Sequence, residues 1–450
     1  MAIEEYDVFV IGTGTAGKKV ADAAVEAGMR VAIADNREYG GTCANRGCDP
    51  KKVLVGITET LERAHDLHGK GICDMPKIDW KDLMAFKETF VDAVPFATER
   101  DLKKSGIKMY HQSPVFLDEN TLSVEGKTVK AKKIVIATGN IPMELKIPGN
   151  QHALISDDFL NLPELPGSMV FIGAGYIGME FAHIAARCGV KVTVIEVSDQ
   201  ILSNFDTKLA SYLQENSEGI GIKFLLNAKV NEIEKLRKNF RVSADQDGKE
   251  VEVKAEMVFN TAGRVPAIAA LDLEKGNVAF GKKGIAVNKF LQSTTNPDVY
   301  ACGDVSDSGS LPLTPFSSQE GRVVAKNITK GNHMELTIPP TPSVVFTQPQ
   351  MASVGFNEKE AREKGYDVIV KEQNVPDWYN SKRMNQNCYA FKTLVDKKTD
   401  LILGAHLLGW DAGETINLFV LAMCGKLDTH TLKGMVFTYP TWGSDIKAMI

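Results

Sequence analysis

The chain has 450 residues, 44% of them hydrophobic and 24% charged, and 52 basic against 57 acidic side chains give a net charge of -5 at pH 7. This is an ordinary globular composition with room for about three domains of roughly 150 residues each. No basic block, no apolar run long enough to cross a bilayer and no positively charged leader is present, so we expect no nucleic-acid partner, no membrane contact and a cytoplasmic location.

The chain opens with YDVFVIGTGTAGKKVADAAVEAGMRVAIAD (6–35), which predicts a strand, a glycine-rich turn, an amphipathic helix and a second strand. The glycines of the GxGxxG turn are Gly12, Gly14 and Gly17. We expect the first to permit the tight turn, the second to let a pyrophosphate approach the backbone and the third to allow close helix packing. Asp35, which ends the second strand, is placed to accept hydrogen bonds from a ribose diol.

The same plan recurs in GSMVFIGAGYIGMEFAHIAARCGVKVTVIE (167–196). Its glycines are Gly173, Gly175 and Gly178, and its acid is Glu196. In both copies the acid follows the first glycine by 23 residues. Two copies with identical spacing predict two dinucleotide sites, and a flavin with a nicotinamide is the pair that we expect.

Of the seven cysteines, only Cys43 and Cys48 form a close pair, in GGTCANRGCDPKK. A chain of this length buries several cores without disulfide staples, so we interpret the pair as chemical rather than structural. We expect a helix to begin near Pro50, where its dipole favours a thiolate, and Arg46 and Lys52 to add positive charge. The other five cysteines are expected to be reduced and buried.

These segments resemble the class I pyridine nucleotide-disulfide oxidoreductases, the family of glutathione reductase, dihydrolipoamide dehydrogenase and mercuric reductase. Further family motifs follow in order: IATGNIP (136–142), GAGYIGME (173–180), TAGRVP (261–266), VYACGDV (299–305), LTPFSSQEG (313–321) and VVFTQPQMASVG (344–355). The resemblance covers essentially the whole chain, and its motifs are specific for the family and much less so for a member.

The resemblance implies an α/β fold with two Rossmann-like dinucleotide-binding domains and a C-terminal α+β dimerisation domain. The FAD-binding domain is expected at 1–148 and 270–330, the NAD(P)-binding domain at 149–269 and the dimerisation domain at 335–450. Composition agrees, because HMELTIPPTPSVV is typical of a linker and LILGAHLLGWDAGETINLFVLAM predicts a buried strand followed by an apolar helix. The resemblance also implies a homodimer.

In this family a nicotinamide passes hydride to the flavin, which reduces a disulfide, which reduces the acceptor. The resemblance assigns Cys48 to the flavin side and Cys43 to the attack on substrate. It also assigns Lys52 to the lysine near the flavin N5 and Glu180 to its ion-pair partner, where a cation stabilises the charge of reduced flavin. Ordinary helix-surface charges are the alternative for these two residues.

Other cofactor contacts follow from the family motifs. Asp304 resembles the acid that binds the ribityl chain, with a helix cap as the alternative. The remaining positions that the resemblance places at the cofactors are Gly41, Thr42, Lys52, Thr138, Gly139, Gly263, Arg264, Gly303 and Thr314. NADH is favoured over NADPH, because Glu196 would repel a 2′-phosphate and no cation follows it before Lys208. We expect no resident metal.

The C-terminal segment FTYPTWGSDIKAMI departs from the family pattern HPTxxE. Tyr439 stands at the histidine position, Ser444 at the glutamate position and Asp445 one residue late, while the nearest histidine is His430. Tyrosines titrate near about 10 and histidines near about 6.5 in water, so a tyrosine there is a poor general base. Mercuric reductase resembles this pattern but carries a C-terminal cysteine pair that this chain lacks. Packing at the dimer interface is the alternative role for Tyr439.

The sequence therefore predicts an FAD-dependent oxidoreductase that passes hydride from NADH through FAD to the Cys43/Cys48 disulfide and on to a small acceptor. Glutathione disulfide, lipoamide, a metal ion and a quinone all stay open as acceptors. A redox-sensing flavoprotein with little disulfide turnover is the alternative.

Overall fold

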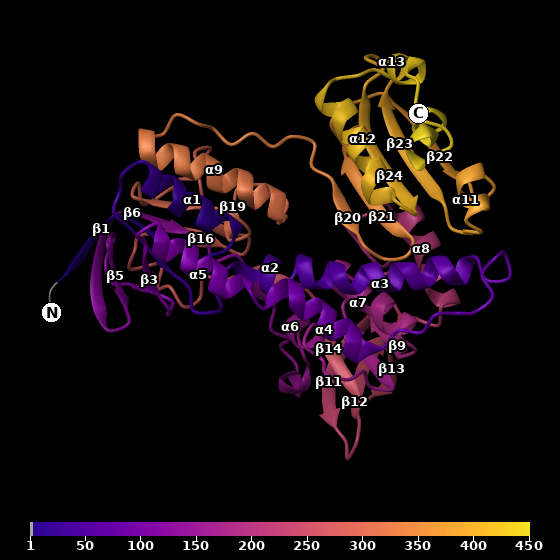
Figure 1. Ribbon diagram of the computed structural model, residues 1–450, viewed down its shortest axis with the longest axis horizontal. Helices are drawn as coiled ribbons and strands as arrows, with labels where there is room; N and C mark the ends of the chain where they lie inside the picture. The colour runs from indigo at the N-terminus through magenta and orange to yellow at the C-terminus, as the bar shows by residue number, and fades with distance from the viewer. Residues whose placement is uncertain (1–2) are drawn as a thin grey trace. The chain divides into compact units, whose positions relative to one another are not determined.

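The computed structural model describes residues 3–450, which divide into two compact units (Figure 1). The first unit comprises the stretch ending at Lys51 together with Ala85–Met143 and Arg264–Ile338, and the second comprises Lys52–Met84, Glu144–Gly263 and Pro339–Ile450. The domain boundaries expected from the sequence stay predictions. Over residues 3–450, no helix combines the length and the apolar character that crossing a membrane requires.

The first unit is built on a seven-stranded sheet of order β3-β2-β1-β6-β5-β4, with β18 paired to β6. The strands are β1 (Glu4–Ile11), β2 (Val31–Ala34), β3 (Lys108–Tyr110), β4 (Val115–Phe116), β5 (Thr121–Val124), β6 (Lys127–Ile136) and β18 (Val299–Ala301). The pairs β1–β2, β2–β3, β1–β6 and β6–β18 are parallel. Consecutive residues Val8, Phe9 and Val10 are fully buried, as expected for a strand covered on both faces.

The helices of the first unit include α1 (Thr15–Glu26), α2 (Gly41–Arg46), α5 (Val94–Lys104) and α9 (Thr314–Lys330). Helices α1 and α9 lie side by side (Figure 1). Gly321 permits this approach, because a Cβ there would lie 2.7 Å from the carbonyl oxygen of Ala16. Helix α9 begins within the motif LTPFSSQEG. Helices α3 (Cys48–Asp66) and α4 (Trp80–Val91) each contain a boundary between the two units.

The second unit repeats the plan with a parallel sheet of order β10-β9-β8-β14. Its elements are β8 (Ser168–Ile172), α7 (Tyr176–Arg187), β9 (Lys191–Ile195), α8 (Thr207–Gly219), β10 (Lys223–Leu225) and β14 (Met257–Asn260). A three-stranded antiparallel sheet of β11 (Ala228–Lys235), β12 (Phe240–Gln246) and β13 (Lys249–Ala255) also belongs to this unit. The predicted repeat of strand, helix and strand is confirmed by β1–α1–β2 and β8–α7–β9.

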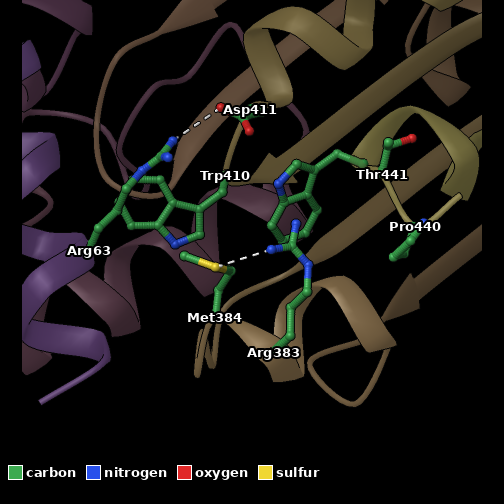
Figure 2. Close-up of a pocket in the computed structure, with 8 residues that line it drawn as sticks. Arg63, Arg383, Met384, Trp410, Asp411, Pro440 and Thr441 are labelled. Atoms are coloured by element: carbon green, nitrogen blue, oxygen red, sulfur yellow. Dashed lines mark hydrogen bonds and ion pairs between the residues drawn. The ribbon is translucent and has the colours of Figure 1, made fainter. Parts of the chain in front are cut away.

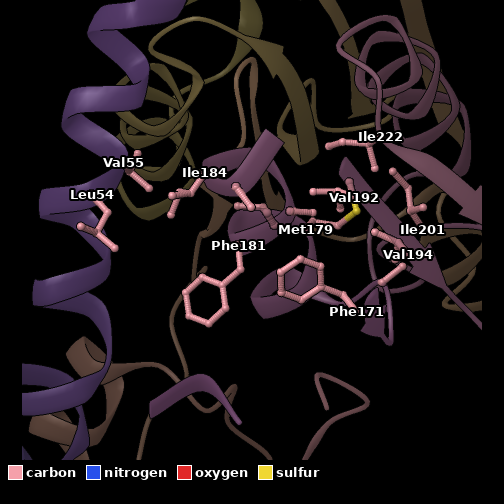
Figure 3. Packing of buried hydrophobic residues seen from close by; sticks show 14 of the residues in the cluster. Leu54, Val55, Phe171, Met179, Phe181, Ile184, Val192, Val194, Ile201 and Ile222 are labelled. Carbon is pink, nitrogen blue, oxygen red and sulfur yellow. The ribbon is translucent and has the colours of Figure 1, made fainter. Parts of the chain in front are cut away.

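The largest core cluster of the second unit packs α3 against α7 and the parallel sheet (Figure 3). Leu54 and Val55 of α3 and Ile184 of α7 are at most 1% exposed. Phe171 of β8 and Phe181 of α7 extend the same cluster. Full burial of each such side chain contributes about 1.5–3 kcal/mol, so this packing fixes the direction of α3 beyond its first turn.

The C-terminal part of the second unit is a five-stranded antiparallel sheet of order β20-β21-β24-β23-β22, and α12 packs on β21 and β24. Its elements are β20 (Ser343–Val345), β21 (Gln350–Gly355), α10 (Glu358–Glu363), β22 (Val368–Asn374), α11 (Tyr379–Arg383), β23 (Ala390–Asp396), β24 (Ile402–Gly409), α12 (Ala412–Cys424), α13 (Thr429–Gly434), η2 (Trp442–Asp445) and α14 (Ile446–Met449). All residues of β24 are buried, so the predicted buried strand followed by an apolar helix is confirmed.

The remaining cysteines do not all follow the sequence expectation. Cys302 and Cys388 are buried, but Cys188 is half-buried and Cys73 and Cys424 are exposed. Cys73 lies in an irregular stretch after α3, and Cys424 is the last residue of α12. Neither position faces a core, so the expectation of burial was wrong for these two thiols.

Candidate active site

The two cysteines of the predicted redox pair lie where α2 meets α3. Cys43 is in α2, and Cys48 is the first residue of α3, two residues before the predicted helix start at Pro50. Proline is still in the first helical turn there, where its missing N–H removes no intrahelical hydrogen bond. Cys48 is exposed and Cys43 half-buried, and the Oγ1 of Thr314 at the start of α9 lies 3.8 Å from the Cys48 Sγ.

The two sulfurs interact directly, and the interaction separates their protonation states. A hydrogen bond from the Cys43 thiol is the main cause that lowers the pKa of Cys48 to about 6, and Thr314 acts in the same direction. The same bond, followed by burial, raises the pKa of Cys43, because a second thiolate would place two negative charges together. Near neutral pH the reduced pair therefore holds one thiolate, on Cys48.

The positive charge near this thiolate comes from a residue that the sequence argument did not choose. Lys51 is the cation that lowers the pKa of Cys48. Arg46 is buried instead, and its Nη1 pairs with Glu38 at 3.0 Å. Lys52 points its ammonium toward an aromatic ring of the second unit. The expectation that Arg46 and Lys52 supply the charge is replaced by Lys51.

The first glycine-rich turn forms a backbone cradle at the start of α1. Gly12 has φ +111°, and a Cβ there would lie 2.3 Å from the carbonyl oxygen of Ala137, so a side chain does not fit. Gly14 is the N-cap of α1 and makes no side-chain cap, which leaves the first N–H groups for an anion. Gly41, with φ +77°, packs against it, since a Cβ on Gly41 would lie 2.4 Å from the Gly14 Cα. A Cβ on Gly17 would lie 2.1 Å from the Gly12 oxygen.

The acid after the second strand accepts from two backbone N–H groups in each repeat, and a threonine hydroxyl adds a third bond in the first. The Asp35 Oδ2 accepts from the backbone N–H of Thr13 (2.8 Å) and from its hydroxyl (2.6 Å), and Oδ1 accepts from the N–H two residues later (3.1 Å). The Glu196 Oε2 accepts from the N–H of Ala174 (2.7 Å), and Oε1 accepts from the N–H two residues later (2.9 Å). Each carboxylate is thereby fixed beside its turn and keeps lone pairs for a ribose.

Further predicted contact residues of the first unit gather at the ends of β6 and β15 (Arg264–Pro266). Thr138 and Gly139 lie two and three residues after the end of β6, and the buried Thr138 hydroxyl has no hydrogen-bond partner within residues 3–450. Such an orphaned oxygen fits a position that a bound cofactor satisfies. Thr42 lies in α2 beside the cradle, and Gly263 and Arg264 mark the passage from the second unit to the first.

The loop after β18 is anchored by a buried glutamate. The N–H of Gly303 donates to Glu320 Oε2 at 2.6 Å, and the Asp304 Oδ1 accepts from the Ser317 hydroxyl at 3.2 Å. Burial raises the pKa of Asp304. Asp304 does not cap α9, whose N-cap is Leu313, so the helix-cap alternative is wrong. Together with the cradle and the orphaned hydroxyl, this arrangement fits an FAD held along the first unit.

The second glycine-rich turn has the same backbone but a more open entrance. Gly173 has φ +106°, and a Cβ on Gly178 would lie 2.1 Å from the Gly173 oxygen. Gly175 is the N-cap of α7 without a side-chain cap, and no atom lies within 4 Å of the Cβ that it would carry. The first turn of α7 is thereby accessible to the pyrophosphate of a nicotinamide dinucleotide.

Lys52 and Glu180 both contact the same aromatic residue of the second unit. The Lys52 Nζ lies 4.0 Å from the ring centroid of Phe346, and the N–H of Phe346 donates to the Glu180 Oε1 at 2.9 Å. Glu180 is 3% exposed. Glu180 is thus engaged inside the molecule, so the surface-charge alternative is wrong for it, whereas Lys52 is exposed and its assignment stays a prediction.

A buried ion pair joins α3 to α7 two turns further on. Arg187 is 3% exposed and donates to Glu62 Oε2 (2.8 Å), to the Gln348 oxygen (2.9 Å) and to His183 Nδ1 (3.0 Å). Because that nitrogen accepts, the proton of His183 is on Nε2, which donates to the Ser217 hydroxyl at 2.9 Å. Burial lowers the pKa of His183 well below its usual value, so this histidine stays neutral and offers no substitute general acid.

The C-terminal segment confirms that the usual acid–base pair is missing. Tyr439 is 73% exposed, precedes a cis proline and lies with its ring centroid 6.3 Å from that of Tyr379. Ser444 donates to a carbonyl oxygen three residues earlier at 2.6 Å. Asp445 accepts from the Tyr389 hydroxyl at 3.0 Å, so it is turned inward and does not replace the glutamate.

A pocket lies beside this segment in the second unit (Figure 2). Two arginines lie against two indoles: the Arg63 guanidinium is 4.7 Å from the Trp410 ring centroid, and that of Arg383 is 5.9 Å from the Trp442 centroid. Asp411 pairs with Arg63 at 3.3 Å, so one of the two cations is already neutralised. The pocket is a preformed feature of the fold next to the segment that carries Tyr439.

Several residues of the site were missed by sequence reasoning. Phe346 lies inside the quoted motif VVFTQPQMASVG, so a signal for it was present. Arg187 and Glu62 are 125 residues apart, and no local pattern announces a pair at that separation. His183 likewise gains its role from tertiary neighbours, whereas Lys51 lies three residues after Cys48 in the motif GGTCANRGCDPKK, so a local signal for it was present.

Comparison with known proteins assigns nearly the whole chain to one family. The family model described as pyridine nucleotide-disulphide oxidoreductase matches residues 6–321, and the dimerisation domain of the same family matches 341–450. Glutathione reductase of Nostoc sp. is 32% identical over 433 residues, covering 93% of this chain and 94% of the relative. Dihydrolipoyl dehydrogenase of Bacillus subtilis is 29% identical, covering 96% and 95%.

Among solved structures, a Cu(II) complex of the HOCl-induced flavoprotein disulfide reductase RclA from Escherichia coli superimposes with a TM-score of 0.88. It is 29% identical and covers 99% of both chains. These matches confirm the α/β fold with FAD-binding and dimerisation domains and the family predicted from the sequence. The chain belongs to the pyridine nucleotide-disulphide oxidoreductase family and is an FAD-dependent oxidoreductase that uses NAD(P)H.

Proposed function

We propose that this enzyme passes electrons from NADH through FAD to the Cys43/Cys48 pair and on to a thiophilic metal ion, with Cu(II) as the acceptor. One observation carries the proposal. The sulfur pair holds a thiolate on Cys48, whereas the C-terminal segment offers the exposed Tyr439 in place of an acid–base histidine. The site is therefore equipped to deliver electrons through sulfur and poorly equipped to deliver a proton.

The chemistry of the acceptor follows from this imbalance. When bound along the first unit, FAD would supply the two-electron relay between NADH and the sulfur pair. Reduction of a disulfide substrate then needs a proton for each leaving thiolate, and a positioned acid contributes about 10²- to 10⁴-fold to such a step. Reduction of Cu(II) balances without one at the acceptor: NADH and two Cu(II) give NAD⁺, H⁺ and two Cu(I). Thiolates are soft ligands that favour Cu(I).

The comparisons support this choice without deciding it. The E. coli relative with a TM-score of 0.88 is described in its structure as a Cu(II) complex. The Nostoc and Bacillus subtilis relatives are named glutathione reductase and dihydrolipoyl dehydrogenase, and these names point to sulfur substrates instead. The departure at Tyr439 is the reason to place this chain with the former.

NADH is proposed as the electron donor because of the surroundings of Glu196. Its carboxylate is fixed beside the second glycine-rich turn, where it accepts from a ribose diol and repels a 2′-phosphate. The next cation along the chain, Lys208, has its Nζ 4.8 Å from the ring centroid of Tyr212. No basic side chain follows Glu196 before that residue.

The working enzyme is proposed to be a homodimer. The second unit exposes Leu421 (67%), Val436 (98%) and Tyr439 (73%), all within the part that matches the family's dimerisation domain. Exposed apolar side chains that gather on one face are typical of an interaction surface. A second copy of this chain would cover them.

The decisive experiment measures NADH oxidation with Cu(II), glutathione disulfide, lipoamide and a quinone, and detects Cu(I) with a specific chelator. We expect turnover with Cu(II) to exceed turnover with either disulfide by about 10²-fold or more. Cys43→Ser is expected to lose Cu(II) turnover, and an enzyme-free mixture corrects for direct reaction. Glutathione disulfide reduction at an ordinary rate of about 10 to 10³ per second would overturn the proposal.

A second variant tests whether the missing acid is what limits turnover with disulfides. Tyr439→His combined with Ser444→Glu restores the family pair and is expected to raise disulfide turnover, while flavin reduction by NADH stays unchanged. If every acceptor is slow although NADH reduces the flavin rapidly, the alternative of a redox-sensing flavoprotein is correct instead.

A further inference from the structure

Helices α1 and α9 enclose a groove on the first unit, and four cations line it: Lys19 from α1, and Arg322, Lys326 and Lys330 from α9. We call this surface the α1–α9 groove. Among its lining residues, all of which the structure describes, Glu26 is the only acid. The charge of this groove is therefore mainly positive, although the whole protein carries a net charge of -5.

These cations have no evident role in the fold. Over residues 3–450 none of the four makes an ion pair or a side-chain hydrogen bond. Some helical cations elsewhere are paired one turn away, as in Lys18 with Asp22 (2.9 Å) and Arg362 with Glu358 (2.9 Å), whereas the exposed Lys103 and Lys104 at the end of α5 make no ion pair within residues 3–450. The α1–α9 groove differs from these positions because four such cations line one groove.

The spacing of the cations is unfavourable for the helix and suited to a linear ligand. Arg322, Lys326 and Lys330 follow one another at intervals of four residues, where like charges repel and destabilise a helix. A rise of 1.5 Å per residue separates neighbours by about 6 Å and the outer two by about 12 Å. The groove between them has Ala23 and Ala325 among its lining residues, so small methyl groups leave its centre free.

We propose that the α1–α9 groove binds a linear polyphosphate chain. Each internal phosphate of such a chain carries a negative charge, and the chain is thin enough to lie between two packed helices with cations on both sides. Single-stranded nucleic acid is disfavoured, because no aromatic side chain lines the groove to stack a base. An acidic helix is disfavoured by its diameter of about 10–12 Å. A bilayer is disfavoured, since no large apolar side chain lines the groove.

The test measures binding of end-labelled long-chain polyphosphate to the FAD-loaded enzyme by fluorescence anisotropy. The variant Arg322→Gln/Lys326→Gln/Lys330→Gln is expected to bind at least about tenfold more weakly, and its salt dependence is expected to flatten by about two units of slope, as for three lost contacts on a single-stranded polyanion. Glu26→Gln is expected to bind more tightly than the parent enzyme, because it removes the acid of the groove.

A matched control changes the same net charge at exposed sites outside the groove, as Lys104→Gln/Lys282→Gln/Lys283→Gln. This variant is expected to bind polyphosphate like the parent, and both triple variants are expected to keep the flavin spectrum and NADH oxidation. Equal losses in the two triple variants would overturn the proposal. So would orthophosphate that competes as well as the long chain, or an oligonucleotide of equal charge that binds as tightly.

Discussion

The two glycine-rich repeats align residue for residue, yet the outer faces of their helices lie in opposite surroundings. Counted from the first glycine of each repeat, the positions of α1 and their counterparts in α7 are Lys19 and Glu180, Asp22 and His183, and Glu26 and Arg187. Lys19 and Glu26 of α1 are exposed and line the α1–α9 groove, and Asp22 is partly exposed. The three in α7 are buried in a polar network with α3 and the segment 346–348.

The comparison shows which part of the repeat is constrained by the nucleotide and which part is free. Both repeats keep the glycine spacing, the uncapped helix start and the acid fixed by a backbone N–H, because a dinucleotide needs all three. The far side of the helix does not touch the nucleotide. In α7 that side binds the helix that begins at Cys48, and in α1 it lines the groove for which we propose a polyphosphate ligand.

A second difference concerns the entrance of each turn. Gly14 is covered by Gly41, whose backbone lies within 4 Å of the Cβ position, whereas nothing lies within 4 Å of the Cβ position at Gly175. The segment that carries Cys43 therefore closes the first turn. We expect this closure to retain FAD between turnovers and the open second turn to let NADH and NAD⁺ exchange.

We expect the largest change in stability from a substitution that breaks the polar network of α7. A substitution at the corresponding position of α1 should have little effect. Arg187→Met leaves Glu62 buried without its cation, and removal of one partner of a buried pair costs about 3–5 kcal/mol. Glu26→Gln changes an exposed, unpaired side chain and is expected to alter the unfolding free energy by less than about 0.5 kcal/mol. Urea unfolding of the two FAD-loaded variants measures both values.

A double variant identifies the cause. Glu62→Gln with Arg187→Met removes both charges, so most of the lost stability should return if the unpaired carboxylate is responsible. A double variant as unstable as Arg187→Met alone would show instead that the contacts of Arg187 with His183 and Gln348 dominate.

The second prediction tests the entrance of each turn with the same substitution. Gly41→Ala forces φ +77° on a residue with a side chain and places a Cβ 2.4 Å from Gly14, at a cost of about 1–3 kcal/mol from backbone strain alone. We expect this variant to lose FAD on purification. Gly175→Ala, with φ -70° and open space, should keep FAD and raise KM for NADH. Flavin content and steady-state kinetics report the two outcomes, and full flavin retention in Gly41→Ala would contradict the expected closure.

Much of this site follows from local sequence, and the remainder depends on distant contacts. The repeat, its acids and the cysteine pair are written in short motifs with fixed spacing, so their elements were predictable within a few residues. The neutral state of His183 and the pairing of Arg187 with Glu62 arise from chain segments more than a hundred residues apart. Each cation of the groove can be read from the sequence. Only the packing of α1 on α9, however, brings Lys19 near Arg322, Lys326 and Lys330.

The third prediction concerns the acid of the second repeat. Glu196→Ala removes the carboxylate that faces the ribose, so NADH should lose a hydrogen bond and NADPH should no longer be repelled. We expect the ratio of kcat/KM for the two nucleotides to shift toward NADPH by about ten- to hundredfold. Asp35→Ala is the matched control in the first repeat, where the ratio should stay unchanged while FAD binds less tightly. An unchanged ratio in Glu196→Ala would show that specificity resides elsewhere in the second unit.

The last prediction uses the segment that closes the first repeat. The Cys48 pKa is about 6 chiefly because the Cys43 thiol donates a hydrogen bond to it, so Cys43→Ala removes the main cause and should raise that pKa by at least about one pH unit. The thiolate is present above the pKa and lost below it. Its long-wavelength absorbance beside oxidised flavin should therefore fade near pH 6 in the reduced parent enzyme and at higher pH in the variant. Thr314→Val removes a weaker contribution and should shift the midpoint less. If Cys43→Ala leaves the midpoint near 6, Lys51 and the start of α3 hold the thiolate without help from the second sulfur.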